Sequence, residues 1–516
     1  MTHCMLEESL PALAVELPED VARLKAGGDW KRAERVIRKR LEKDLPKALR
    51  ERLLLELEIL ERIPGEYPFA WDEAVKEAQG MFRDFTGEEL EALLEEGAVE
   101  WIYLDGTIHL KDNFVANLVK TRADLTDRIL QPEAEADRQE NFRMLNDAIR
   151  MMKEHESVRC QFHVRSALTV CPERQRPGKR IQVQLPLPVL DSQVKEVRVL
   201  DCGILADGKK VDLPSSIQIA PETFPQRTVC FETEYQAGME FYTEFTFETQ
   251  MRYWDWEKAQ AELDQQAELD QQTGQERQDR QGQKDGQMRM AAGSDGRGRD
   301  LTEDPDVGPY LKEQMPHIRF TPYLQALTAE VIGEETEPLK KAKRIYDYIT
   351  SHVMYSFVRP YFTIEQQATF TASNLKGDCG LQALLFITMC RIAGVPARWQ
   401  SGLYANPRGI GCHDWAQFYL EPYGWLYADC SFGGAAARAG AGERREFYFG
   451  NLEPYRMVAA SQYQHGFYFP KRFLRQDPYD NQMGEAEYED ENLAGLGGTE
   501  TRHEMLAITL TGEKDV

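Results

Sequence analysis

The sequence lacks any uninterrupted apolar run of about 18 residues, so it predicts no membrane-spanning helix. It also lacks an excess of positive charge, because 86 acidic residues outnumber 62 lysines and arginines and give a formal net charge of −24 at pH 7. Such a surface repels phosphate backbones and anionic lipid, so we expect neither nucleic acid nor a membrane as a partner. The first residues contain no cationic or apolar region, which predicts no signal peptide and a cytoplasmic location.

The spacing of the cysteines excludes the commonest zinc signature. No two of the nine cysteines are spaced Cys-x-x-Cys, and their odd number, together with the missing export signal, favours reduced thiols. The acidic run 485–491 lacks the spacing of a calcium loop, and we interpret it as a solvated surface. The sequence therefore predicts no metal and no organic cofactor.

The first 150 residues are interpreted as a mainly helical region. Apolar residues recur at three- and four-residue spacing between 28 and 80, and another helical run opens at Thr86. The pair Asp105-Gly106 predicts a hairpin turn between 99 and 110. This pattern also suits a winged-helix nucleic-acid binder, but the acidic charge argues against it and favours a packing or protein-contact module.

From residue 157 the apolar residues recur at every second position, as Val158, Cys160, Phe162 and Val164 illustrate. This period is typical of half-buried strands and predicts an antiparallel, β-sandwich-like domain over 157–255. The stretch 256–308 is rich in glutamine and glycine and has almost no large apolar residues. We interpret it as a low-complexity linker, since it cannot bury enough surface to offset its ordering entropy.

A cysteine at the start of a buried helix is the first candidate nucleophile. Residues 381–392 are apolar on nearly all sides, and Gly394 and Pro396 predict the end of the helix. Cys379 therefore falls at the helix N-terminus, between two glycines. Unpaired backbone amides and the helix dipole favour a thiolate there. Position alone does not separate this interpretation from a buried structural thiol.

Two later residues supply partners for this thiol. His413 opens one expected strand, and Asp429 ends the next strand after a turn at 423–425, so a hairpin brings them near each other. With Cys379 they would form a nucleophile, a proton acceptor and a carboxylate that orients the imidazole. Asp414 is the rival carboxylate, but neighbours on a strand face opposite sides, so we expect it to point away from the imidazole.

Three separated motifs occur in order between about 335 and 435: Gly377-Asp378-Cys379-Gly380 with the helix that ends in Ala393-Gly394-Val395-Pro396-Ala397-Arg398, then His413-x-Trp415, then Gly424-Trp425-x-x-x-Asp429. This series resembles the core of the transglutaminase-like superfamily, in particular its bacterial cysteine-protease-like members. The resemblance implies an α+β, papain-like core with Cys379 as nucleophile, His413 as general base and Asp429 as orienting carboxylate. Cys430 departs from the family, in which proline commonly follows the aspartate, and Cys412 beside His413 is also unusual.

The resemblance implies a catalytic domain over 309–516, after the helical region 1–150, the β domain 157–255 and the linker 256–308. In it, Cys379 would attack a carboxamide or peptide carbonyl and form a thioester, which water or an amine resolves without a cofactor. The candidate donors for the oxyanion are the backbone N–H of Cys379 and the side chains of Tyr355, Gln366 and Gln367.

Three functions stay open at this point. We favour hydrolysis of protein or peptide substrates, because superfamily members outside animals are more often hydrolases than cross-linkers. A protein-glutamine transglutaminase shares the same residues and differs only in the group that reaches the thioester. A non-catalytic protein-binding scaffold is the third alternative, although no residue of the triad is missing. The sequence gives no indication of the oligomeric state.

Overall fold

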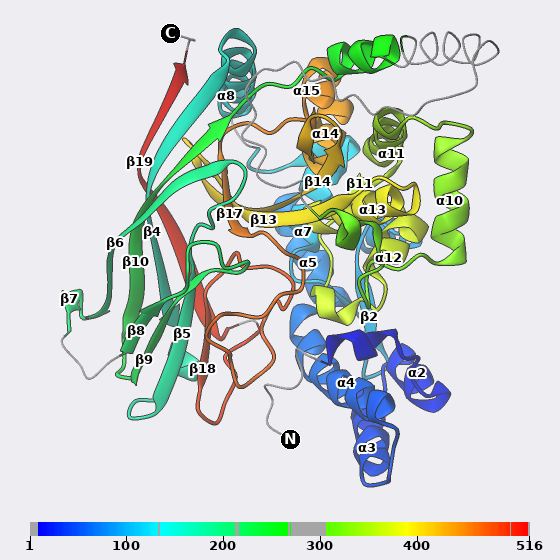
Figure 1. The fold of residues 1–516 in the computed structure, drawn as a ribbon. Helices are drawn as coiled ribbons and strands as arrows, with labels where there is room; N and C mark the ends of the chain where they lie inside the picture. The colour runs from blue at the N-terminus through cyan, green and yellow to red at the C-terminus, as the bar shows by residue number, and fades with distance from the viewer. Residues whose placement is uncertain are drawn as a thin grey trace, which may run out of the picture.

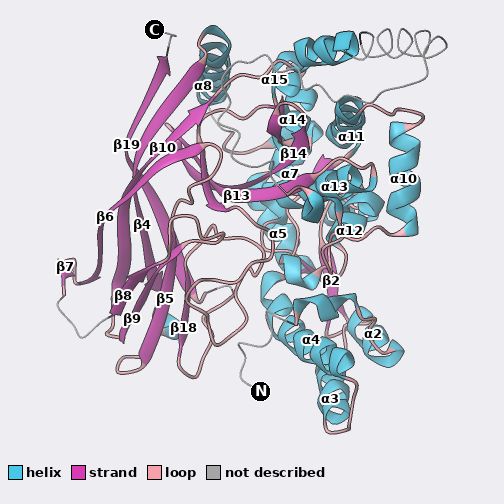
Figure 2. Cartoon of the chain, in the orientation of Figure 1, coloured by secondary structure: helices cyan, strands magenta, loops and turns pink. Residues whose placement is uncertain are grey.

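The computed structural model describes residues 9–132, 135–211, 216–266, 269, 306–495 and 497–513. A strongly twisted pair of sheets forms one side of the molecule, and a mainly helical half with a smaller sheet forms the other (Figure 1). Figure 2 shows that most strands lie in the first half and most helices in the second, although one helix stands beside the large sheets and a smaller sheet runs through the helical half. Within the described ranges, no helix is long and apolar enough to cross a membrane.

The N-terminal region is mainly helical, which confirms the prediction. Its helices are η1 (Leu10–Ala14), α2 (Glu19–Ala26), α3 (Trp30–Leu41), α4 (Lys47–Glu66), α5 (Trp71–Met81), α6 (Gly87–Glu95), α7 (Phe114–Thr121), η2 (Ala123–Arg128) and α8 (Glu135–Glu154). Three short strands form a sheet in the order β1-β3-β2, namely β1 (Phe69–Ala70), β2 (Trp101–Leu104) and β3 (Thr107–Leu110). Asp105 and Gly106 have φ of 49° and 83°, as the predicted hairpin turn requires.

Residues 69–129 have a small hydrophobic core of their own. Phe82, Leu90, Leu110, Phe114 and Leu118 lie in it, separate from the main core of the molecule. The helices α5, α6, α7 and η2 contribute side chains to this core together with strands of the β1-β3-β2 sheet. We call residues 69–129 the hairpin subdomain.

The period-two stretch forms the predicted antiparallel strands. They are β4 (Ser157–Val170), β5 (Arg180–Pro186), β6 (Val194–Ala206), β7 (Lys209–Lys210), β8 (Ser216–Ile219), β9 (Thr228–Glu234) and β10 (Glu240–Met251), with η3 (Pro172–Arg174) after β4. They belong to two sheets, of order β19-β4-β10-β6-β7 and β18-β5-β9-β8, in which β18 is Glu485–Tyr488 and β19 is Thr499–Glu513. Phe162 and Phe247 stack between neighbouring strands, with ring centroids 4.2 Å apart.

Two strands of the sandwich come from the C-terminus of the chain. The strand β18 (Glu485–Tyr488) pairs with β5, and β19 (Thr499–Glu513) pairs with β4 along its whole length, as the red strand in Figure 1 shows. The predicted catalytic segment 309–516 is therefore too long at its C-terminal end. The local pattern of these residues indicates strands, but it does not encode which distant strand they pair with.

The interpretation of 485–491 as a solvated surface is wrong at its start. Glu485 and Glu487 are buried in β18. Glu485 lies 2.8 Å from Lys471 and 2.9 Å from Arg475, and these cations lower its pKa to about 2 although burial alone would raise it. The run thus serves as one side of a buried ion network. In the part of the chain that the structure describes, no group of three or more His, Cys, Asp or Glu side chains could hold a metal ion.

The predicted linker starts too early. Residues 256–266 are helical and packed, with Trp256 against Phe449 (ring centroids 6.2 Å apart) and the Asp264 carboxylate 3.0 Å from Lys340 Nζ. Their apolar residues are few but pack against residues of the helical half, as Trp256 does. Amino-acid composition cannot show such long-range contacts. The rest of the tract to 305, apart from residue 269, lies outside the described residues, so the linker stays a prediction there.

The helical half combines helices with a five-stranded sheet of order β16-β15-β14-β13-β17. The strands are β13 (Ala397–Asn406), β14 (Gly409–Leu420), β15 (Gly424–Ala428), β16 (Phe449–Gly450) and β17 (Arg456–Ala460), with the parallel pair β11 (Met354–Tyr355) and β12 (Lys376–Gly377) beside them. The helices are η4 (Gly308–Leu311), α10 (Pro322–Ile332), α11 (Pro338–His352), η5 (Tyr361–Thr363), α12 (Gln367–Asn374), α13 (Cys379–Ile392), α14 (Cys430–Arg438) and α15 (Gly442–Phe447). This α+β arrangement confirms the predicted fold class.

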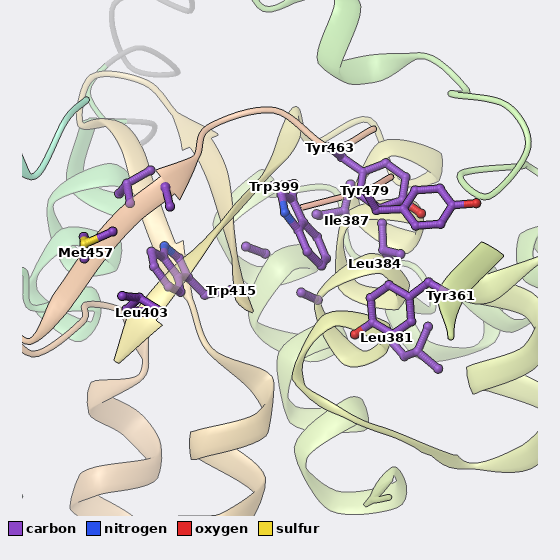
Figure 3. Packing of buried hydrophobic residues seen from close by; sticks show 14 of the residues in the cluster. Tyr361, Leu381, Leu384, Ile387, Trp399, Leu403, Trp415, Met457, Tyr463 and Tyr479 are labelled. Atoms are coloured by element: carbon purple, nitrogen blue, oxygen red, sulfur yellow. The ribbon is translucent and has the colours of Figure 1, made fainter. Parts of the chain in front are cut away.

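The buried helix α13 packs on one face of this sheet. Phe386 of α13 meets Phe418 of β14 with ring centroids 6.0 Å apart. In Figure 3 the indole of Trp399 lies over Leu384 and Ile387 of the helix, while Trp415 lies farther from them. Since Trp399 pairs with Ala416, the even-numbered residues of β14 share the face toward α13.

Candidate active site

Cys379 lies at the N-terminus of α13, as predicted. Asp378 caps the helix, because its Oδ1 accepts a hydrogen bond from the Leu381 amide at 3.1 Å. The same oxygen accepts the Tyr361 hydroxyl proton at 2.7 Å. The cap and the tyrosine fix the start of the helix, and with it the position of the Cys379 thiol.

Cys379 opens into a pocket of about 360 Å³. Its lining includes Tyr355, Phe357 and Tyr361 and, from the segment between β17 and β18, residues 475–477 and 480–484. Cys412 also lines the pocket, with its sulfur 3.6 Å from that of Met483. A partly buried thiol thus faces a cavity large enough for a side chain or a short peptide segment.

The nearest partner of the Cys379 thiol is Asp414. The distance from Sγ to Oδ2 is 3.3 Å, and the thiol donates. The other carboxylate oxygen of Asp414 accepts from Gln482 Nε2 at 2.5 Å. Asp414 is buried between these two donors, so its carboxylate has a fixed orientation toward the nucleophile.

His413 and Asp429 lie together, as the hairpin pattern predicts. Nε2 of His413 is 2.8 Å from Oδ2 of Asp429, and both side chains are buried. Asp429 caps α14 through its other oxygen, which accepts from the Phe432 amide at 2.9 Å. Arg456 Nη1 lies 2.9 Å from Oδ2, the oxygen that His413 also binds, and Arg456 Nε contacts Glu453. The imidazole therefore belongs to a buried network of four charged or titratable groups.

The two pairs lie on opposite faces of β14. His413 is an odd-numbered residue of this strand and faces Phe432, whose ring centroid is 4.7 Å away, whereas Asp414 faces Cys379. Among the described residues, no hydrogen bond joins Cys379 to His413. The structure thus brings His413 to Asp429 and Cys379 to Asp414, and it does not join Cys379, His413 and Asp429 in one triad.

The electrostatics of Cys379 differ from the expectation of a lowered thiol pKa. Burial raises the pKa of Cys379 well above its usual value, and the neighbouring carboxylates Asp414 and Asp378 raise it further. Burial likewise raises the pKa of Asp414 well above its usual range and that of Asp378 to about 6. The helix N-terminus alone predicted a thiolate, but the acidic surroundings outweigh it. The thiol and the two carboxyl groups beside it are therefore all easier to protonate than usual.

In the His413 network the pKa values are lowered, in contrast to those around Cys379. Burial lowers the pKa of His413, and the Arg456 charge adds to this effect while Asp429 opposes it. Burial alone would raise the pKa of Asp429, but His413 and Arg456 outweigh it and hold that pKa below its usual value. The result is a neutral imidazole beside an ionised carboxylate.

The candidate oxyanion donors have different surroundings. Gln367 donates to the Tyr361 carbonyl at 2.9 Å and accepts from the Tyr463 hydroxyl at 2.7 Å, so both ends of its amide are engaged. Tyr355 lines the pocket, whereas Gln366 is the N-cap residue of α12. Of these three side chains, Tyr355 alone lines the pocket of Cys379.

The sequence reasoning missed Asp414 as the partner of the thiol. It correctly expected Asp414 to point away from His413, but it grouped Cys379 with His413 and Asp429 and not with Asp414. A signal was present in β14, because Ala416, Phe418 and Leu420 form the more apolar phase of the strand and share their face with Asp414. The apolar phase of a strand is the one that covers a buried helix.

With this geometry established, the chain can be compared with known proteins. The family model of the transglutaminase-like superfamily matches residues 325–430, a span that holds Cys379, His413 and Asp429. Residues 325–430 form a transglutaminase-like domain. The predicted resemblance is confirmed for this span.

One sequence relative is an uncharacterized protein of Haemophilus influenzae, which is 29% identical over 154 residues. The match covers 25% of this chain and 42% of that protein, so the chain spans less than half of the length of this relative. Two solved structures are similar to the chain that carries the transglutaminase-like domain. A candidate cysteine protease from Cytophaga hutchinsonii has 13% identity, 69% coverage of this chain, 90% coverage of its own and a TM-score of 0.35. The periplasmic domain of TgpA from Pseudomonas aeruginosa is 13% identical. That match covers 58% of this chain and 96% of the TgpA domain, with a TM-score of 0.26.

Proposed function

We propose that the protein is a cysteine-nucleophile acyl-transfer enzyme that hydrolyses amide bonds of proteins or peptides through a thioester. The observation that carries this proposal is the thiol of Cys379 at the N-terminus of α13, open to a pocket of about 360 Å³ and 3.3 Å from a carboxylate. The family match of the surrounding domain supports a cysteine-based enzyme in general.

The first chemical step is proton transfer from the thiol together with attack of sulfur on the carbonyl carbon. A tetrahedral oxyanion forms, and the Cys379 backbone N–H and the Tyr355 hydroxyl are the donors available to it. Return of the proton to the leaving nitrogen releases an amine and leaves the thioester. Water then adds to the thioester, gives its proton to the same acceptor, and leaves as part of a carboxylic acid while the thiol re-forms.

The proton acceptor that the geometry favours is Asp414. A carboxylate of ordinary pKa is a poor base for a thiol, but burial raises the pKa of Asp414 well above its usual range and so makes this carboxylate a stronger base. The alternative is the triad of Cys379, His413 and Asp429 that the family motif implies, and the 2.8 Å contact between His413 and Asp429 supports it. For that triad to act, the imidazole has to reach the Cys379 face of β14.

The proposal is tested by active-site labelling and by product analysis. Iodoacetamide followed by peptide mass spectrometry measures alkylation at each cysteine, and an unfolded or casein-like substrate offered with a fluorescent primary amine separates new carboxyl ends from amine incorporation. We expect peptide cleavage that the Cys379→Ala variant loses. The matched control is Cys412→Ala, which removes the other thiol of the pocket and should keep activity.

Three results would contradict parts of this proposal. Cleavage that survives Cys379→Ala would exclude Cys379 as the nucleophile. Amine incorporation without cleavage would favour the transglutaminase alternative. A protein that binds a polypeptide but forms no acyl-enzyme with it would favour the scaffold alternative.

A further inference from the structure

The N-terminal helix α4 contributes two side chains to the pocket of Cys379. Arg62 and Glu66 lie one turn apart at the end of α4, and both line the pocket. Glu66 binds Lys111 of the hairpin subdomain at 3.2 Å, so its charge is paired within the N-terminal region. Neither residue of α4 belongs to the span 325–430 that matches the transglutaminase-like superfamily. The pocket is therefore completed by a part of the chain outside that domain.

Part of the pocket lining comes from a segment without regular secondary structure. Residues 461–484, all of which the structure describes, connect β17 to β18 and contain neither a helix nor a strand. We call them the wall segment, because residues 475–477 and 480–484 line the pocket. Such a segment has to find hydrogen-bond partners for much of its backbone in other parts of the chain.

Arg62 binds two consecutive carbonyls of the wall segment. Its Nη1 donates to the Arg475 carbonyl at 2.8 Å, and its Nη2 donates to the Leu474 carbonyl at 2.9 Å. Glu58, one turn earlier in α4, lies 3.0 Å from the same Nη2. Asn492 also donates to the Leu474 carbonyl, at 2.8 Å. The planar guanidinium presents its donors in a fixed fork, so it can span two neighbouring carbonyls that a single donor cannot.

Arg62 also contacts η5. Its guanidinium lies over the ring of Phe362, 5.1 Å from the centroid, and Phe362 lines the pocket as well. Tyr361, the residue before Phe362, donates to Asp378 at the start of the helix that carries Cys379. Arg62 consequently connects the wall segment to η5, which is itself bonded to the helix of the nucleophile.

The wall segment carries the residue that binds Asp414. Gln482 Nε2 donates to Oδ1 of Asp414 at 2.5 Å, and Oδ2 of Asp414 lies 3.3 Å from Sγ of Cys379. Gln482 can hold this carboxylate only while the wall segment keeps its place. The two hydrogen bonds from Arg62 to that segment therefore bear on atoms next to the nucleophile.

We infer that Arg62 is a positioning residue of the active site: it holds the wall segment, and with it the donor Gln482, in place beside the nucleophile. The inference rests on the proposed function, in which Cys379 is the nucleophile and Asp414 the proton acceptor. It assigns α4 a part in the reaction in addition to its part in the fold.

The first measurement is hydrogen exchange followed by mass spectrometry, which reports the backbone of the wall segment without any substrate. Arg62→Met removes both hydrogen bonds to the carbonyls and keeps an unbranched side chain. We expect the amides of 474–484 to exchange about tenfold faster in this variant, because a lost hydrogen bond from a charged donor makes local opening that much easier. Arg62→Lys should show a smaller change, since an ammonium can still bind one carbonyl.

The second measurement is the pH profile of amide cleavage, which a purely structural role of Arg62 would not move. A loosened wall segment weakens the hydrogen bond from Gln482, which favours the ionised carboxylate of Asp414. We expect the acidic limb of kcat/KM in Arg62→Met to move to higher pH, and kcat/KM below the limb to fall about tenfold for a shift of one unit.

The matched control is Arg50→Met. Arg50 is another half-buried arginine of α4, and it also donates to two backbone carbonyls, those of Leu41 at 3.1 Å and Lys43 at 2.8 Å. Arg50 does not line the pocket, and both carbonyls that it binds belong to the N-terminal region. Its replacement should leave the exchange of 474–484 and the acidic limb unchanged.

Exchange of 474–484 that is equal in Arg62→Met and the wild type would overturn the inference. Faster exchange with an unmoved acidic limb would also overturn it, because Arg62 would then serve the fold alone. The same changes in Arg50→Met would indicate a general loosening of α4 and would have the same consequence. If Arg62→Met does not fold, Arg62→Lys takes its place, since it keeps the charge beside Glu58 but not the fork.

A substrate-free assay separates this inference from the proposed function. Iodoacetamide and a fluorescein-bearing iodoacetamide alkylate the same thiolate of Cys379, so the ratio of their rates reports access to the pocket and is independent of the thiol pKa. We expect the wild type to favour the small reagent and Arg62→Met to lose part of that preference. If the wild type cleaves no amide bond, the proposed function fails. A changed ratio would then leave the role of Arg62 at the pocket in place, whereas an unchanged ratio would overturn that role as well.

Discussion

Cys379 and Asp414 face each other with 3.3 Å between Sγ and Oδ2, while His413, the residue before Asp414, binds Asp429 on the opposite face of β14. The transglutaminase-like domain therefore holds two groups that could accept a proton, His413 and Asp414. They are neighbours in the sequence, but their side chains lie on opposite faces of the sheet. Which of them serves Cys379 decides how the enzyme works.

We expect Asp414→Asn to lower kcat/KM for amide cleavage by about 10²–10⁴, because an amide cannot take the thiol proton. Asparagine has the same shape and can still accept the hydrogen bond from Gln482, so circular dichroism should show an intact fold. The measurement is cleavage of a peptide amide by equal amounts of folded variant and wild type. Asp477→Asn is the control, since Asp477 lines the same pocket and, in the part of the chain that the structure describes, makes no hydrogen bond to the thiol.

The companion variant is Asp429→Asn. If the triad of the family motif acts, this change should lower turnover by about 10⁴, as neutralising a triad aspartate does in serine proteases, while Asp414→Asn should have little effect. A folded and fully active Asp414→Asn variant beside an inactive Asp429→Asn variant would thus establish His413 as the base.

Arg456 is expected to stabilise the fold and to keep His413 neutral. Arg456→Met leaves Asp429 and Glu453 buried without their cation, which typically costs about 3–5 kcal/mol of unfolding free energy. Because Arg456 lowers the pKa of His413, its removal should raise that pKa, which NMR of the imidazole measures. Arg150→Met, at an exposed arginine of α8, is the control. A variant with unchanged stability in urea would contradict this role.

The helix of Cys379, the hairpin of His413 and Asp429, and the alternating strands were all predictable from sequence. Each depends on a local pattern of apolar residues, such as the run after Cys379, or on residues typical of turns, such as the Asp105-Gly106 pair. The pairing of β19 with β4 was not predictable in this way, because more than 300 residues separate the partners and any strand period permits many pairings.

The surroundings of the thiol were the hardest part to predict. The helix N-terminus indicated a lowered pKa, but Asp414, Asp477 and Asp480 reach the pocket from segments far from Cys379 in sequence. The contact of Gln482 with Asp414 depends in the same way on long-range packing. A motif specifies residue types at a site, whereas their pKa values depend on which charges the rest of the fold brings there.

The buried His317 should make the protein sensitive to acid. Burial lowers its pKa to about 3, and its Nε2 lies 2.6 Å from the Tyr479 hydroxyl. Below about pH 6.5 the unfolded chain binds a proton that the folded protein refuses, so this residue lowers stability as the pH falls toward 3, by up to about 4 kcal/mol. Asp378 acts with the opposite sign, because its pKa is raised to about 6.

A difference measurement isolates the contribution of His317. We compare the unfolding free energies of wild type and His317→Gln in urea at several pH values, so that the contribution of Asp378 cancels. The variant should gain on the wild type as the pH falls from 6.5 to 4. His352→Gln, at an exposed position at the end of α11, should show no such gain. A difference that does not change with pH would contradict the assignment.

Gln482 links the sandwich to the nucleophile. His503 of β19 accepts from the Ser166 hydroxyl at 2.7 Å through Nδ1 and donates through Nε2 to the Gln482 carbonyl at 3.1 Å. Gln482 in turn donates to Asp414 at 2.5 Å. Two sheets and the pocket wall therefore hold the carboxylate that contacts Cys379.

Removal of this donor should shift the pH profile of turnover. A hydrogen bond from Gln482 favours the ionised form of Asp414, so Gln482→Leu should raise the pKa of that carboxyl further. If Asp414 must be ionised to take the thiol proton, the acidic limb of kcat/KM moves to higher pH, and activity below the limb falls by about tenfold for a shift of one unit. His503→Ala should shift the limb less, because it only loosens the Gln482 backbone. Gln476→Leu changes another residue of the same wall and should leave the limb in place. An acidic limb that stays fixed in Gln482→Leu would show that Asp414 does not control the reaction, and it would return the role of base to His413.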